Sequence, residues 1–176
     1  NISAKEIVAG AANINVVYNS SYGSVTGAGV NGTAGQKATV TAAAASGSKF
    51  LGWTDENNML LSTSASFSFV TSGNDTLKAL FANPNGEAYF TAGNYIHSDL
   101  NKAAAASSLV VLAADGTLGA GNYTIPSGVT LLIPKDSSNK VYTNIPECID
   151  KESNPYVQPT AYRTLRMADG ANITVA

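Results

Sequence analysis

Apolar and polar residues alternate with a period of two along much of the first half of the chain. In the segment KATVTAA, residues 37–43, Val40 and its two flanking alanines fall on one face and two threonines on the other. Successive side chains of a strand point to opposite faces, so this period is typical of a sheet that is wet on one side. The same pattern recurs at residues 66–70 and 76–82. We therefore expect a small all-β domain here, without a helix.

Turn residues separate these alternating segments. The sequences VNGTAGQ, TDENN and TSGND are rich in Asn and Gly, which accept the positive φ angles of tight turns. They are predicted turns, and the segments between them are predicted strands. Strands are expected at residues 14–19, 23–29, 37–43, 49–53, 66–70 and 76–82, with turns at 30–36, 54–58 and 71–75.

The composition limits the class of protein. Among 176 residues, 44% are hydrophobic and only 12% are charged, so polarity comes mainly from Ser, Thr, Asn and Gly. This balance favours a secreted or cell-surface β-protein. A formal net charge of -2 and the absence of a Lys/Arg cluster argue against a nucleic-acid partner. No apolar run is long enough to cross a bilayer, and no signal peptide begins the sequence, which suggests an excerpt or a processed chain.

The texture changes after the segment ANPNGE, residues 82–87, which we predict to be a linker. A hairpin around Gly93 and a short alanine-rich helix follow, with Ser98 as the expected N-cap and Asp99 in the first turn. We therefore divide the chain into an all-β repeat-like domain, residues 1–82, and a second region, residues 83–176.

From residue 109 onwards, short apolar strands alternate with glycine-containing corners. The sequence AADG at 113–116 returns as MADG at 167–170, a loose repetition that indicates stacked coils. A polar insertion with three prolines, residues 135–161, separates the two copies. The second region is thus predicted to be a hairpin–helix cap followed by the first coils of a β-solenoid, and the whole fold is expected to be mainly β.

Trp53 is the chain's only tryptophan. The many apolar residues on neighbouring strands favour burial of its ring in a small core, where one indole removes a large area from water. The alternative is a stacking platform for a sugar, to which Tyr18 and Tyr22 are the nearest further aromatic candidates. Of the two interpretations, we expect the core.

A family resemblance joins these observations. Residues 14–82 resemble the divergent internalin-B-type B-repeat of Gram-positive surface proteins, through Gly23, the strand entry at 35–42, the Phe50–Trp53 element, the phenylalanines of 66–70 and the exit TLKALF. The resemblance implies a spacer or adhesive module without catalytic residues. The second region resembles, more weakly, the segment that leads into a pectate-lyase-like right-handed β-solenoid.

An enzyme is the main rival interpretation. Pectate-lyase-like solenoids use clustered acids that hold calcium and an arginine as base. The available residue types are scattered in ordinary turns or in the polar insertion, so we expect no catalytic, cofactor or metal site in this chain. Cys148 and His97 are each the only one of their type. The residues weighed for the lyase chemistry are Asp115, Asp136, Asp150, Asp169, Arg163 and Arg166.

We therefore expect a non-catalytic stalk or adhesion module of a secreted or wall-attached bacterial protein, whose partner is a surface glycan or protein. Two alternatives stay open: a carbohydrate-binding module, and the N-terminal part of a polysaccharide lyase or hydrolase whose active site lies beyond the sequence. The segment ANITVA, residues 171–176, is the expected site of dimerisation, because an unfinished coil leaves a strand edge unpaired.

Overall fold

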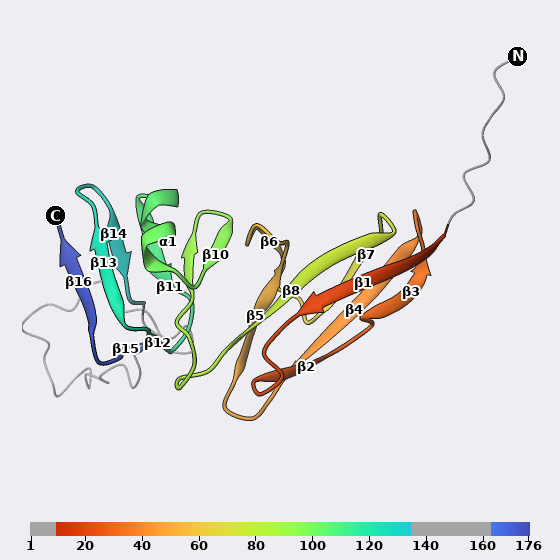
Figure 1. Cartoon of the computed structure of the whole chain (residues 1–176), viewed down its shortest axis with the longest axis horizontal. Helices are drawn as coiled ribbons and strands as arrows, with labels where there is room; N and C mark the ends of the chain where they lie inside the picture. The colour runs from red at the N-terminus through yellow and green to blue at the C-terminus, as the bar shows by residue number, and fades with distance from the viewer. Residues whose placement is uncertain (1–9, 135–162) are drawn as a thin grey trace, which may run out of the picture.

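Two facing β-sheets build the front module of the computed structural model, which describes residues 10–134 and 163–176 (Figure 1). The larger sheet has the strand order β3-β1-β8-β5-β6, and β1 runs parallel to β8 while the other pairs are antiparallel. The smaller sheet, β2-β4-β7, is antiparallel throughout. The strands are β1 (Ala11–Val17), β2 (Gly23–Thr26), β3 (Gly29–Thr33), β4 (Lys37–Ala44), β5 (Lys49–Thr54), β6 (Leu60–Ser62), β7 (Ser66–Val70) and β8 (Asn74–Ala82).

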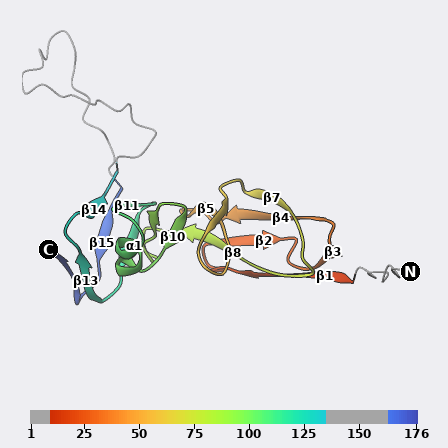
Figure 2. The ribbon, with the colours of Figure 1, turned by 90° about the horizontal axis from the view of Figure 1, so that it is seen from above.

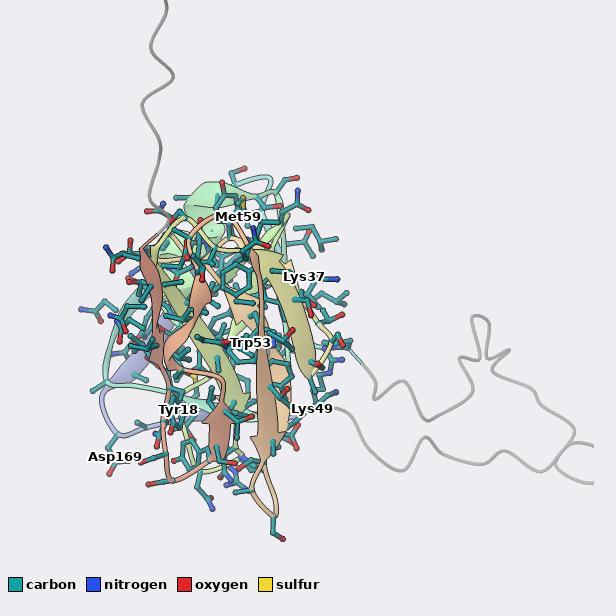
Figure 3. The ribbon with its side chains drawn as sticks, turned by 90° about the vertical axis from the view of Figure 1, so that its right-hand side faces the viewer. Tyr18, Lys37, Lys49, Trp53, Met59 and Asp169 are labelled. Carbon is teal, nitrogen blue, oxygen red and sulfur yellow. The ribbon has the colours of Figure 1, made fainter. Side chains whose placement is uncertain are left out.

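The core of the front module lies between these two sheets. Trp53 of β5 is fully buried there (Figure 3), and its Nε1 donates to the carbonyl oxygens of Ser64 at 3.1 Å and Ala65 at 3.3 Å. Phe50 and Phe81 pack beside it. The alternating face of β4 supplies the other side of the core, as the sequence predicts. The expectation that Trp53 is a core residue is confirmed.

Two strands lie where the sequence predicts turns or gives no strand signal. The short β3 occupies the first part of the predicted turn 30–36, and β6 follows the second turn. Both are edge strands of the larger sheet, so they need no apolar alternation to be held by a neighbour. The third turn is shorter than expected, because β8 begins at Asn74.

A hairpin and a helix open the second module. Strands β9 (Phe90–Ala92) and β10 (Tyr95–His97) pair antiparallel, and Gly93 between them has a φ of 59°. The helix α1 (Leu100–Ala106) is present as predicted, but its N-cap is Asp99 and not Ser98. The Asp99 carboxylate accepts from the amide of Asn101 at 2.9 Å, which is the bond an N-cap side chain makes.

Six further strands form two stacked turns of three strands each. Every strand of the first turn pairs in parallel with its counterpart in the second: β11 with β14, β12 with β15, and β13 with β16. This is the pairing that the opening coils of a solenoid require. Figure 2 shows the stack at the end opposite the front module. The strands are β11 (Leu109–Leu112), β12 (Gly116–Leu118), β13 (Gly121–Ile125), β14 (Thr130–Leu132), β15 (Leu165–Met167) and β16 (Ala171–Val175).

The two ADG corners are not equivalent positions of successive turns. The first precedes β12, whereas the second lies between β15 and β16. Since Leu118 pairs with Met167, the second corner lies opposite the corner that follows β12. The repetition of these letters therefore reflects turn chemistry at two different corners, while the coils are related by their strand register. Residues 135–161, the predicted insertion, lie outside the described residues.

Replacing Trp53 with alanine should strongly destabilise the front module. The substitution removes a fully buried indole, and the short neighbouring side chains of the core cannot fill the cavity that it leaves. We expect a loss of roughly 3–5 kcal/mol in the free energy of unfolding, measured by chemical denaturation. Val30→Ala is the matched control, since Val30 is 77% exposed. Equal stability of the two variants would contradict the core assignment.

Candidate functional site

The predicted linker is held against the front module by its own side chains and backbone. The Asn83 side-chain amide donates to the Ser48 hydroxyl at 3.0 Å and to the Gly47 carbonyl at 3.3 Å. Gly86 is buried against the ring of Tyr22, so close that a Cβ at this position would lie 2.7 Å from a ring carbon. These contacts fix the linker where it leaves β8.

The same segment also pairs with the first turn of the stack. Glu87 forms a parallel bridge with Thr117 of β12. The Thr117 amide donates to the Gly86 carbonyl at 2.7 Å, and the Ala88 amide donates to the Thr117 carbonyl at 3.0 Å. Gly116 allows this approach, because a Cβ there would lie 2.6 Å from the Ala88 Cα. The linker thus behaves as a short strand of the second module.

Arg166 on β15 completes the attachment of the linker. Its guanidinium donates to the Asn85 side-chain oxygen at 2.8 Å and to the Pro84 carbonyl at 3.2 Å. The second turn of the stack therefore holds the linker as well as the first. From the sequence, Arg166 was only a possible catalytic base, because no local pattern links it to Pro84 and Asn85.

A second contact joins the modules away from the linker. The turn between β5 and β6 meets the β9–β10 hairpin, where Met59 bridges to Tyr95. The Leu60 amide donates to the Asn94 carbonyl at 2.8 Å, and the Ile96 amide donates to the Asn58 carbonyl at 3.0 Å. Two separate sets of backbone hydrogen bonds, one at the linker and one at the hairpin, thus restrain both bending and rotation of one module relative to the other.

The three strands in the first turn of the stack each have an outer edge, and each edge is covered by a different part of the chain. The edge of β11 pairs with β9, and that of β12 pairs with the linker. The edge of β13 is met by the side chain of Asn101 on α1. Its amide donates to the Asn122 carbonyl at 3.1 Å, and its oxygen accepts from the Thr124 amide at 2.9 Å. This single side chain imitates the backbone of a neighbouring strand, so the turn is closed on this side.

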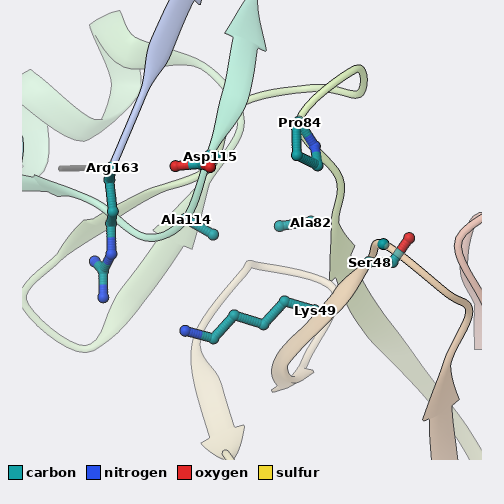
Figure 4. A pocket seen from close by; sticks show the side chains of 8 residues that line it. Ser48, Lys49, Ala82, Pro84, Ala114, Asp115 and Arg163 are labelled. Atoms are coloured by element: carbon teal, nitrogen blue, oxygen red, sulfur yellow. The ribbon is translucent and has the colours of Figure 1, made fainter. Parts of the chain in front are cut away.

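A cleft of about 170 Å³ lies between the modules beside the linker (Figure 4). Lys49 enters it from the front module, and Asp115 and Arg163 enter it from the second. The Arg163 guanidinium donates to the Leu112 carbonyl at 2.6 Å, and Asp115 accepts from the Thr164 amide at 2.7 Å. Both polar side chains are thus occupied in holding the corner between β11 and β12 close to the start of β15.

A groove of about 230 Å³ is also formed by residues of both modules. Tyr18, Asn19 and Lys78 line it from the front module. Its other side is lined by Glu87, at the end of the linker, and by Tyr89 just beyond it. Burial, together with the nearby Glu87 and Tyr22, raises the pKa of Tyr89 to about 12. The phenol of Tyr89 therefore remains protonated at any physiological pH.

The three residues proposed for sugar stacking differ in how much of their rings is exposed to solvent. Trp53 offers no face to solvent, and Tyr22 packs half-buried against the core and Gly86. Tyr18 is 38% exposed and meets Phe81 edge-on, with ring centres 6.3 Å apart. Of the three, Tyr18 presents accessible ring surface to a ligand. Tyr89, its neighbour in the groove, was not singled out from the sequence.

The residues weighed for lyase chemistry are only partly brought together. Asp115 and Arg163 share the cleft, but Asp169 is exposed at another corner. Within residues 10–134 and 163–176, no three His, Cys, Asp or Glu side chains are placed to hold a metal ion. His97 stacks on Tyr95, and its burial lowers the pKa of the imidazole. Asp136, Asp150 and Cys148 lie outside the described residues.

Comparison with known proteins finds one family that the front module is similar to. Residues 14–85 match the family model of the divergent InlB B-repeat domain. The resemblance predicted for residues 14–82 is therefore confirmed, and it points to a repeat module of a bacterial surface protein. No curated protein and no solved structure matches the chain. In the described part of the chain, no helix has the length and apolar character to cross a bilayer.

The pKa of Tyr89 reports directly on the contact between the two modules, because Tyr89 lines the groove that both of them form. Its pKa of about 12 in the folded protein lies above the ordinary tyrosine value of 10.0, so the unfolded chain loses this proton at lower pH than the folded one. Stability should therefore be full below pH 10 and fall as the pH rises towards 12. Tyr89→Phe should remove that part of the alkaline loss. Denaturation at stepped pH checks this, and an unchanged alkaline loss in the variant would contradict it.

Proposed function

We propose that this chain is a non-catalytic structural module of a bacterial surface protein, in which a B-repeat-type domain is joined rigidly to the start of a β-solenoid stalk. The observation that carries the proposal is the linker, whose residues 86–88 pair with β12 while Asn83 bonds to the turn before β5. A flexible tether between independent domains does not need such bonds. A stalk benefits from them, because they keep its modules in line.

The size of the restraint supports this role. Each backbone hydrogen bond contributes about 1 kcal/mol net, and four such bonds lie in the two junction contacts: Thr117 to Gly86, Ala88 to Thr117, Leu60 to Asn94, and Ile96 to Asn58. Opening the junction also exposes apolar surface around Gly86 and Ile96. The closed arrangement should therefore dominate in solution, and a chain of such modules should stand out from the cell as a semi-rigid rod.

The cap gives the proposed stalk a direction. The side of the first turn that faces the front module is covered at all three strands, whereas in the described residues the outer edges of β14, β15 and β16 have no strand partner. Met167 and Val175 are exposed at this end. Further strands can add there and nowhere else on the stack. Association of two copies through residues 171–176 is part of the proposal, and it should appear as a concentration-dependent mass.

Gly116→Ala tests the rigid junction, because the new Cβ collides with the backbone of Ala88, a buried residue of the second module next to the linker. We expect the linker to separate from β12. Proteolysis within residues 83–89 should become faster, and the pKa of Tyr89 should return towards its ordinary value. Gly119→Ala is the matched control, since nothing lies within 4 Å of its Cβ position.

The outcome separates a joint from a simple tether. If Gly116→Ala and Gly119→Ala give the same cleavage rate and the same Tyr89 titration, the linker contacts do not hold the modules. An unchanged melting temperature of the front module in both variants shows that the core around Trp53 is intact.

A second candidate function is binding of a surface glycan. Tyr18 favours it, because its exposed ring lies in the groove beside the side chains of Asn19, Lys78 and Glu87, and sugars bind where an aromatic face meets polar groups. The host or bacterial glycan remains unidentified. Loss of glycan-array binding in Tyr18→Ala, with unchanged melting, would favour this function over a purely mechanical stalk. The lyase alternative would require residues beyond those described.

A further inference from the structure

Strand β7 is one of the two edge strands of the smaller sheet, and β2 is the other. Strand β7 pairs with β4 on one side, and in the described part of the chain no strand pairs with its other side (Figure 2). Its sequence, SFSFV, contains no charge and no proline, which are the usual means of protecting an edge strand from pairing with another chain. An unprotected edge of this kind is a template for an added strand.

The register with β4 shows which backbone groups are free. The Thr71 amide donates to the Gln36 carbonyl, and the Ala42 amide donates to the Ala65 carbonyl. Hydrogen-bonded pairs alternate along an antiparallel ladder, so the odd-numbered residues of β7 bond to β4. The amides and carbonyls of Ser66, Ser68 and Val70 therefore point outward. Their spacing matches the donors and acceptors of an incoming extended strand.

A groove of about 420 Å³ lies beside this edge, on the open side of the two-sheet sandwich. Phe67 and Phe69 line it, with their rings stacked at 5.3 Å, and Leu61 and Leu77 add apolar surface. An added strand on β7 can direct alternate side chains into this groove, since side chains on one face of a strand repeat every second residue.

All the charged side chains that line the groove are acidic. They belong to Asp55, Glu56 and Asp75. Hydrogen bonds from Thr71 and Ser72 to the Asp75 carboxylate outweigh the opposing effect of partial burial and hold its pKa below the ordinary value. This carboxylate thus keeps its charge in mildly acidic surroundings. A cation that enters the groove meets both these carboxylates and the faces of aromatic rings, which attract it.

We propose that the β7 edge and this groove bind an extended basic segment of a partner protein by strand addition, with lysine or arginine side chains lying over the two phenylalanines. Main-chain bonds to Ser66, Ser68 and Val70 provide the pairing, and the acidic rim selects the charge. A second copy of this chain is a poorer occupant. Its net charge is -2, and pairing β7 with β7 brings two acidic rims close together.

The test uses a fluorescent synthetic peptide in which lysine alternates with valine, and a counterpart with glutamate in place of lysine. Anisotropy with the whole chain should show binding of the lysine peptide only, and the binding should weaken as salt is added. Ser68→Pro removes one outward amide without disturbing the ladder to β4. Its affinity should fall by roughly fivefold or more, the effect of one lost backbone hydrogen bond together with the steric effect of the ring.

Two controls make the result specific. Thr39→Ala removes the same hydroxyl contact with Ser68 from the β4 side and leaves every outward amide of β7 in place, so it should bind as the original chain does. Glu56→Lys should weaken binding, whereas Asp169→Lys, the same charge change at a distant exposed corner, should not. Equal binding of both peptides, or unchanged affinity in both Ser68→Pro and Glu56→Lys, would overturn the proposal. So would self-association that Ser68→Pro abolishes without any peptide binding, because the edge would then belong to a second copy.

Discussion

Pairing of the linker with β12 is the interaction on which the arrangement of the whole molecule depends. Residues 86–88 cover the outer edge of β12 in the first turn of the stack, and the bonds that do so also help to determine where the front module sits. The same hydrogen bonds thus cover the edge of β12 and join the two modules. An open edge at β12 would leave backbone donors unpaired and would remove one of the two sets of backbone hydrogen bonds between the modules. The glycine at 116 is the local requirement, since only its missing side chain allows the two backbones to approach.

Each module contributes a separate small core to this arrangement. The front cluster is built around Trp53 between two sheets, and the rear cluster around Phe90 and Leu100, beneath the helix and the first turn. Cores of this size give each module only a small free energy of unfolding, because short chains bury a smaller fraction of their surface. The junction adds hydrogen bonds and contact surface that neither core supplies. This explains how a chain rich in alanine, serine and threonine can hold two small modules together.

Local patterns in the sequence predicted the features that depend on local rules. The period-two alternation of residues 37–43 located β4, and the aromatic neighbours of Trp53 indicated its burial. Gly93 marked the hairpin, and the alanine run marked α1, although the N-cap lies one residue later than expected. The edge strands β3 and β6 escaped prediction, because a neighbouring strand holds them and their own pattern does not.

The junction could not be predicted for a different reason. The bond of Arg166 to Asn85 joins residues that are 81 positions apart in the sequence. The contacts by which Asn101 imitates a strand leave no signature in the sequence beyond one asparagine on a helix. Likewise, no pattern in the sequence connects Tyr89 with Tyr18, since the groove that contains both exists only when the modules meet. Such features depend on the three-dimensional path of the chain.

Residual dipolar couplings of the backbone amides, measured for both modules in one alignment medium, test the central claim most directly. If the linker and hairpin contacts hold the modules as one body, a single alignment tensor should fit the couplings of residues 11–82 and 88–132 together, with the relative orientation seen in Figure 1. Two tensors of clearly different magnitude would show that the modules move independently, and would contradict the account of a rigid, capped joint.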